Sequence, residues 1–170
     1  MERVAIIGNS GGGKSQLARR LAARHGLPHY EVDALLWRPG WVLAPAEDYG
    51  AAHAALIAGE RWVIDGLGRR DSIAARLDRA GTIILIDMPL WMHFWLAAER
   101  QVAAAQGAVM HPPGGIAEPL STESLFRTIA EVDRDWMPEI RALVAAAERR
   151  GAIVTRLASV EEIDAFAAQL

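Results

Sequence analysis

The strongest constraint on the fold lies near the N-terminus, in the glycine-rich segment Gly8–Ser15, which reads GNSGGGKS. The apolar run Val4–Ile7 precedes it and is typical of a buried strand. The segment Gly13–His25 follows it with Leu17 and Leu21 on one face, which predicts a helix. A strand that enters a helix through glycines begins an α/β unit, so we expect a sheet with parallel strands.

The same segment matches the pattern G-x-x-x-x-G-K-[ST] without a mismatch. Glycines let successive backbone N–H groups point into one concavity, where they and the helix N-terminus hold phosphate oxygens. We expect Lys14 to reach the β- and γ-phosphates of a nucleotide and the Ser15 hydroxyl to bind Mg²⁺. Lys14 is the sole lysine among 18 basic residues, which supports a specific role. The predicted cofactor-binding residues are Gly8, Asn9, Ser10, Gly11, Gly12, Gly13, Lys14, Ser15 and Gln16.

Further apolar runs along the chain each lead into a helical pattern. The predicted strands cover residues 4–7, 29–33, 62–65, 82–87 and 152–157. Strand then helix, five times over, predicts a three-layer α/β fold with a five-stranded parallel sheet and helices on both faces. Residues 34–45 are expected to be irregular, and 121–150 are expected to form a long helix kinked at Pro138.

Composition excludes several classes of function. The chain has no cysteine, which rules out disulfides, cysteine-bound metals and thiol catalysis. A net charge of −3 gives no whole-chain reason to expect a nucleic-acid partner. The apolar stretch 83–98 is interrupted by Asp87, Pro89 and His93, so we expect no membrane span. The N-terminus lacks a signal-peptide pattern, and a cytoplasmic location is predicted.

A phosphate-binding loop indicates nucleotide binding but does not name a reaction. A guanine-reading N-K-x-D motif would need a second lysine, so a GTPase of that type is excluded. A helicase or transport ATPase usually needs a larger domain than 170 residues. The length therefore favours a kinase that acts on a nucleotide or a metabolite.

Four more segments point to one family: 32–41 (VDALLWRPGW), 61–66 (RWVIDG), 83–89 with Trp91, and 154–157 (VTRL). With the glycine-rich loop, they resemble the adenylate-kinase-related P-loop kinase group often labelled "topology modulation protein". The resemblance covers nearly the whole chain and implies the adenylate-kinase-type strand order 2-3-1-4-5. It further implies a single P-loop kinase-like domain over 1–170, with an acceptor-side segment at about 34–58 and a lid at about 107–121.

The resemblance also implies roles for particular side chains. Asp65, which ends the third predicted strand, would be the carboxylate that holds Mg²⁺ through water. Asp87 is its rival, or caps the next helix. Arg69 would grip an acceptor phosphate. Asp33, at the edge where α/β sheets bind ligands, would orient the acceptor hydroxyl or take its proton, unless it is an exposed loop carboxylate.

Tryptophans and arginines complete the predicted site. Trp37 and Trp41 either form a wall of the acceptor pocket or pack beneath a loop. The other tryptophans, Trp62, Trp91, Trp95 and Trp136, are expected in the core. Arg100, Arg127 and Arg134 are expected to neutralise phosphate charge in the closed state, unless each is a solvated helix charge. The chain departs from the related kinases at Leu90 and Leu96, where arginines are common, and at Gly68.

The predicted activity is ATP-dependent phosphoryl transfer to a small-molecule or nucleotide acceptor, with ATP and Mg²⁺ as cofactors. The predicted catalytic residues are Lys14, Asp33, Arg100, Arg127 and Arg134. Two alternatives remain: a nucleotide-binding regulator or weak NTPase without kinase activity, and a DNA-associated protein. We expect a monomer or homodimer whose partners are a nucleoside triphosphate and a small acceptor, with no membrane or nucleic-acid partner.

Overall fold

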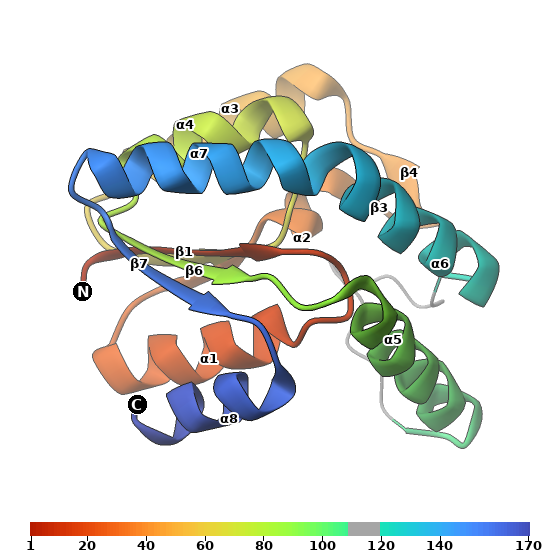
Figure 1. Cartoon of the computed structure of the whole chain (residues 1–170). Helices are drawn as coiled ribbons and strands as arrows, with labels where there is room; N and C mark the ends of the chain where they lie inside the picture. Colours follow the sequence, from red (N-terminus) through yellow and green to blue (C-terminus); the bar gives the residue numbers. More distant parts are fainter. Residues whose placement is uncertain (109–119) are drawn as a thin grey trace.

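The computed structural model describes residues 1–108 and 120–170, and it shows an α/β fold with three layers (Figure 1). The central sheet is parallel, in the order β2-β5-β1-β6-β7. Its strands are β1 (Arg3–Gly8), β2 (His29–Glu31), β5 (Trp62–Asp65), β6 (Thr82–Ile86) and β7 (Ile153–Leu157). This order confirms the predicted 2-3-1-4-5 arrangement, with the strand that enters the glycine-rich loop in the middle.

Helices cover both faces of the sheet (Figure 1). One face carries α1 (Lys14–His25) and α8 (Val160–Ala168), and the other carries α3 (Ala46–Ala58), α4 (Ile73–Arg79) and α7 (Met137–Arg149). The carboxyl ends of the strands meet three further helices, α2 (Val32–Leu36), α5 (Leu90–Ala105) and α6 (Thr122–Glu131). Because loops that follow parallel strands gather at this end, it is where an α/β sheet binds ligands.

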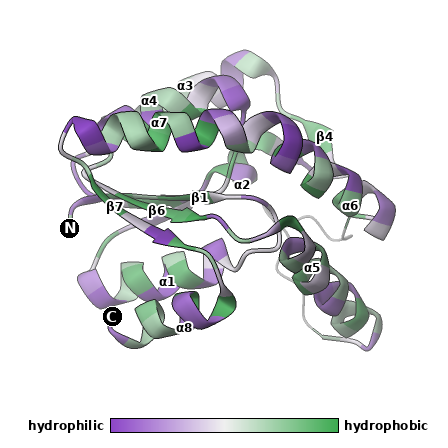
Figure 2. Ribbon diagram, in the orientation of Figure 1, coloured by the Kyte–Doolittle hydropathy of each residue, from purple (hydrophilic) through white to green (hydrophobic). Residues whose placement is uncertain are grey.

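The core divides into two layers because successive strand residues point to opposite faces. On β1, Val4 and Ile6 join the cluster under α1 and α8, whereas Ala5 and Ile7 join the cluster under α4 and α7. All four side chains are fully buried. A strand buried on both sides reads as a continuous apolar run, which is why it could be recognised from sequence. Figure 2 shows hydrophobic residues along the central strands, between helices that carry both hydrophobic and hydrophilic residues.

Three local predictions were wrong in detail. The second strand ends at Glu31, and residues 32–36 form α2 instead of extending that strand. Part of the segment expected to be irregular forms an antiparallel hairpin of β3 (Trp37–Arg38) and β4 (Val42–Leu43). The long helix expected to be kinked at Pro138 instead contains a π-helical turn, η3 (Val132–Trp136), between α6 and α7. Pro138 has no N–H to continue the regular helical ladder, which accounts for a break here.

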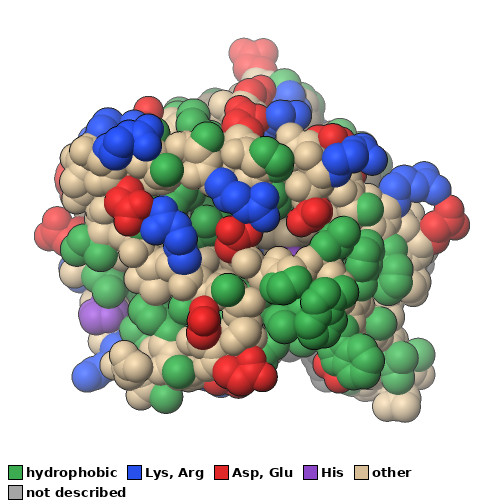
Figure 3. All heavy atoms as spheres, viewed as in Figure 1, with side chains coloured by type: hydrophobic (Ala, Val, Ile, Leu, Met, Phe, Trp, Pro, Cys, Tyr) green, Lys and Arg blue, Asp and Glu red, His purple; other side chains and the backbone are tan. Residues whose placement is uncertain are grey.

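The tryptophans do not all lie in the core as predicted. Trp62 is fully buried, but Trp91 and Trp95 of α5 are 63% and 62% exposed. They lie four residues apart on one helix face, and hydrophobic side chains gather over α5 in Figure 3. The buried side of α5 is instead formed by Ala97 and His93. None of the described helices is long and apolar enough to cross a membrane.

Candidate active site

The glycine-rich loop joins β1 to α1 at the carboxyl end of the sheet. Gly8 lies so close to β6 that a Cβ atom there would be 2.2 Å from the carbonyl oxygen of Ile86. Gly13 caps α1 with a left-handed φ of 76°, so the backbone turns sharply before Lys14 starts the helix. The free N–H groups of the first helical turn therefore face the loop, which is the arrangement that binds phosphate.

Two neighbouring helices hold the loop in place. Asn9 is fully buried, and its Nδ2 donates to the carbonyl oxygen of Ile129 on α6 at 2.9 Å. Its Oδ1 accepts from the Ser10 N–H at 2.7 Å. The carbonyl oxygen of Ser10 lies 2.8 Å from Nδ1 of His93 on α5. Burial lowers the pKa of His93, so at neutral pH the ring is uncharged and donates this hydrogen bond.

Lys14 is buried at the head of α1, and its ammonium donates to the carbonyl oxygen of Asn9 at 2.7 Å. Burial lowers the pKa of Lys14, and the carboxylates of Asp33 and Asp65 oppose that shift. The ammonium therefore lies across the loop, with two acidic groups close enough to stabilise its charge. This is the position from which a lysine reaches the phosphates of a nucleotide.

Asp65 connects the loop to the neighbouring strands. The residue is 1% exposed, and its Oδ2 accepts from the Ser15 hydroxyl at 2.7 Å. Its Oδ1 lies 2.7 Å from Nε2 of His29 on β2. Asp87 is bound by the guanidinium of Arg141 on α7, with a shortest contact of 2.8 Å. Asp65, and not Asp87, thus contacts the serine that is expected to bind Mg²⁺.

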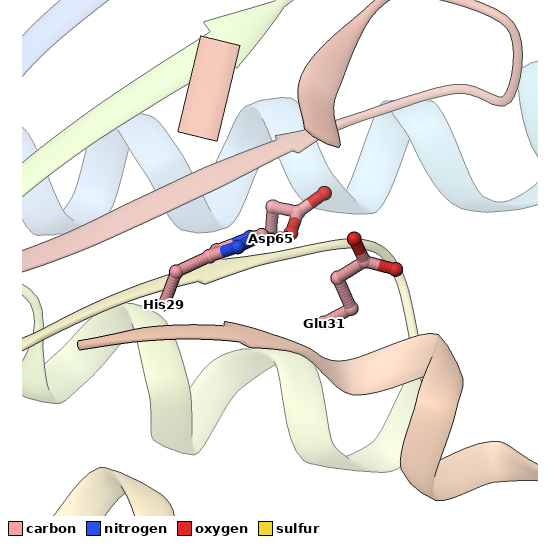
Figure 4. A group of neighbouring side chains, drawn as sticks. All are labelled: His29, Glu31 and Asp65. Carbon is pink, nitrogen blue, oxygen red and sulfur yellow. Dashed lines mark hydrogen bonds and ion pairs between the residues drawn. The ribbon is translucent and has the colours of Figure 1, made fainter. Parts of the chain in front are cut away.

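Asp65 and two neighbouring side chains could together hold a divalent cation. Strand register places Glu31 opposite Asp65, and His29 lies two residues earlier on the same face of β2. Ligand atoms of His29, Glu31 and Asp65 lie within 4.8 Å of one another, and Figure 4 shows the imidazole and both carboxylates brought together. Burial, followed by the Asp65 carboxylate, raises the pKa of Glu31, while Arg19 pairs with it from α1. Sequence analysis included neither His29 nor Glu31 in the site.

Asp33 lies in the short helix α2 and not at the end of a strand, as was predicted. Its Oδ1 accepts from the Gly68 N–H at 3.0 Å. Burial raises the pKa of Asp33, whereas Lys14 and the Gly68 hydrogen bond oppose the shift. The carboxylate is therefore held by the turn that follows β5 and is electrostatically coupled to Lys14.

Arg76 of α4 is a site residue that sequence analysis missed. It is 0% exposed, and its Nη2 donates to the carbonyl oxygens of Gly66 at 2.9 Å and Leu67 at 3.2 Å. Its neighbours on the helix face, Ile73 and Leu77, belong to the core. A charged residue on the apolar face of an amphipathic helix was the available sequence signal.

The other predicted residues are placed as follows. Arg100 is exposed at the surface, its charge lowers the pKa of Lys14, and desolvation by the surrounding protein lowers its own pKa. Arg69 contacts Asp71 at 3.5 Å, and Trp37 meets Trp41 edge to face with ring centroids 5.4 Å apart.

Arg127 and Arg134 are exposed and pair with Glu123 and Asp135 on their own helical segments. Their catalytic role remains a prediction, as does the lid, because residues 109–119 lie outside the described part.

The sheet order, the loop and the Ser15–Asp65 pair define a P-loop protein with the fold of the adenylate-kinase-like kinases. No protein-family model matches the chain. A cytidylate kinase from Granulibacter bethesdensis is 34% identical over 108 residues, which are 63% of this chain and 51% of that protein. The chain thus matches about half the length of this curated relative.

Solved structures confirm the fold along almost the whole chain. A gluconokinase from Sinorhizobium meliloti aligns over 99% of this chain and 92% of its own, with 20% identity and a TM-score of 0.51. The shikimate kinase of Acinetobacter baumannii aligns over 99% and 90%, with 13% identity and a TM-score of 0.56. The shikimate kinase of Aquifex aeolicus aligns over 98% and 92%, with 17% identity and a TM-score of 0.50. The resemblance to adenylate-kinase-related proteins is thus confirmed for the fold, and the narrower label "topology modulation protein" stays a prediction.

Proposed function

We propose that the chain is a Mg²⁺-dependent kinase that transfers the γ-phosphoryl group of ATP to a small-molecule or nucleotide acceptor. The observation that carries this proposal is the set of contacts at the carboxyl end of the sheet. Lys14 lies across the loop, and the Ser15 hydroxyl donates a hydrogen bond to Asp65. Asp33 is close enough to Lys14 to raise its pKa. The curated relative is a kinase, which supports the same class of reaction.

In the proposed reaction, an acceptor oxygen attacks the γ-phosphorus, and the bond from that phosphorus to the β–γ bridging oxygen breaks. The loop N–H groups and Lys14 hold the phosphate oxygens, and ADP leaves with the electron pair of the broken bond. Asp33 orients the acceptor and takes the proton of an acceptor hydroxyl. Mg²⁺, held by Ser15 and through water by Asp65, would neutralise phosphate charge. Arg100 adds positive charge beside Lys14.

The acceptor side is assigned to residues 34–58, with Asp33, Trp37, Trp41 and Arg69 around the acceptor. The lid is assigned to about 107–121, with Arg127 and Arg134 contributing charge when it closes. We place the enzyme in the cytoplasm, as a monomer or homodimer. The relatives' names include one nucleotide kinase and kinases named for gluconate and shikimate, so both a nucleotide and a hydroxylated metabolite are candidate acceptors.

The test is ³¹P NMR of the purified protein with Mg·ATP, alone and with pooled nucleoside monophosphates, nucleosides and hydroxylated metabolites. We expect a new phosphorylated product with the wild-type chain. Lys14→Ala should slow its formation by about 10²–10³-fold, by analogy with the loss of one preorganised donor. Arg20→Ala, an exposed change on the same helix, is the matched control and should leave the rate unchanged. ATP binding without transfer to any acceptor would favour a nucleotide-binding regulator instead.

A further inference from the structure

The guanidinium of Arg76 is buried with few hydrogen-bond partners. Its side chain is 0% exposed, and only Nη2 is bonded, to the carbonyl oxygens of Gly66 and Leu67. Its Nε and Nη1 have no partner among the residues that the structure describes. Burial of a charge with unsatisfied N–H groups is unfavourable, and apolar residues of similar volume often stabilise a core better. Stability alone therefore does not explain an arginine at this position.

The surroundings of Arg76 show where its charge acts. Asp33 and Asp65 are the carboxylates that interact with it, and Tyr49 and His53 of α3 are its other ionisable neighbours. The charge of Arg76 also lowers the pKa of Lys14 across the site. Asp33 and Asp65 are the acidic groups on the acceptor and magnesium sides of the proposed reaction. The buried cation thus offsets negative charge that would otherwise gather beside the phosphates.

A short series of contacts also links Arg76 to the position of Asp33. Arg76 binds the first two carbonyl oxygens after Asp65, and Gly68, the next residue, donates its N–H to Asp33 Oδ1. Gly66 and Gly68 have left-handed φ angles of 103° and 64°. A Cβ atom on Gly66 would lie 2.9 Å from Asp33 Oδ2, so the turn fits closely against this carboxylate. Glycines allow this shape but do not enforce it, because they are the most flexible residues.

We propose that Arg76 is a positioning residue: it clamps the turn 66–68 so that Gly68 holds the Asp33 carboxylate in line with the acceptor. Arg76 touches neither nucleotide nor acceptor in this assignment, and it acts through two backbone carbonyls and one N–H. The proposal rests on the proposed function, because it takes Asp33 as the group that orients the acceptor. The part of the proposal in which Arg76 holds the turn 66–68 in place does not depend on catalysis.

The test compares Arg76→Met, which removes the charge and its hydrogen bonds, with Arg76→Lys, which retains a cation. Arg79→Met is the matched control, since Arg79 lies one turn further on α4 and is partly exposed to solvent. We expect Arg76→Met to fold and to bind Mg·ATP within about threefold of wild type, while kcat/KM falls by about 100-fold, the loss typical of a misplaced reacting group. The kcat/KM of Arg76→Lys should be about tenfold higher than that of Arg76→Met. The Gly68 amide resonance in a ¹H–¹⁵N spectrum should shift in Arg76→Met and stay unchanged in Arg79→Met.

The proposal fails if Arg76→Met transfers phosphate at the wild-type rate, or if it folds and leaves the Gly68 resonance unchanged. It also fails if both Arg76 variants unfold, since the residue would then serve the fold alone. A wild-type chain that phosphorylates no acceptor would overturn the proposed function. The Gly68 resonance would still decide whether Arg76 holds the turn, so the two failures are distinguishable.

Discussion

At the scale of single residues, His53 makes the stability of the protein depend on pH. Its ring is buried and stacks on Tyr49 with centroids 5.7 Å apart, and its Nε2 has no partner within the described part of the chain. Burial, followed by the charge of Arg76, lowers the pKa of His53 to about 4. In the unfolded chain a histidine takes a proton near pH 6.5. Between these values the unfolded state binds more protons, so stability is lost as the pH falls.

We therefore expect the free energy of unfolding to decrease by about 2 kcal/mol between pH 7 and pH 5 on account of His53. Urea denaturation at the two pH values measures this loss. His53→Phe keeps an aromatic ring against Tyr49 and carries no titrating group, so its stability should fall by about 2 kcal/mol less than that of wild type. His25→Asn changes an exposed histidine and should leave the loss unaltered. Equal losses in wild type and His53→Phe would contradict the assignment.

The residue scale is also where sequence analysis was weakest. Lys14, Ser15 and Asp65 could be recognised because each has a fixed place relative to a strand end or a motif. His29 and Arg76 were missed, because their roles come from contacts with segments 36 and 10 residues away in sequence and the position of Arg76 on an apolar helix face was the one available signal. An arginine on α4 reads as a surface charge until the packing of that helix is known.

At the scale of elements, the turn after β5 is a tight fit between two helices. Gly68 has a φ of 64°, and a Cβ atom there would lie 2.1 Å from the hydroxyl oxygen of Tyr49. That hydroxyl is fixed, because it accepts from the Arg69 N–H at 3.2 Å and lies 3.0 Å from the Ser72 hydroxyl. A side chain at position 68 thus meets a clash in addition to the strain of a left-handed backbone.

We expect Gly68→Ala to reduce the free energy of unfolding by about 2–4 kcal/mol, from backbone strain and overpacking together. Gly26→Ala is the matched control: its φ of 59° is similar, nothing lies within 4 Å of an added Cβ, and only about 1–2 kcal/mol of strain applies. Chemical denaturation of both variants gives the difference. Tyr49→Phe in the Gly68→Ala background should restore part of the lost stability. Equal losses at the two glycines would show that Tyr49 moves aside freely.

Elements with strong apolar patterns could be predicted, and short polar ones could not. Strands β1, β5 and β6 were found because buried parallel strands are continuous apolar runs, whereas the edge strand β2 is short, polar and only partly buried. Helix α2 was read as strand and loop, since five residues carry too little periodicity to distinguish the two. Trp91 and Trp95 were placed in the core on side-chain type and spacing, whereas α5 packs Ala97 against the loop at Gly11 and leaves both tryptophans outside.

At the scale of the whole molecule, the proposed nucleotide binding is expected to be coupled to folding. The loop that would hold phosphate also joins β1 to two helices. Asn9 binds Ile129 on α6, and the Ser10 carbonyl binds His93 on α5. A ligand that binds the folded chain alone therefore stabilises all of these elements together. At 100 times its dissociation constant, such a ligand adds about 2.7 kcal/mol. For a domain of this length, that is an increase in Tm of about 5–10 °C.

We therefore expect saturating Mg·ATP to raise the Tm by about 5–10 °C in a thermal-unfolding experiment followed by circular dichroism. Lys14→Ala should lose most of the increase, whereas Arg20→Ala should retain it, because only Lys14 lies on the phosphate-binding loop. Excess EDTA should remove part of the increase, since the phosphates would then lie beside the Asp65 carboxylate without the cation that offsets both negative charges. An equal increase for Lys14→Ala would mean that the nucleotide stabilises the chain from another surface. The contacts of Lys14, Ser15 and Asp65 would then need an explanation other than nucleotide binding.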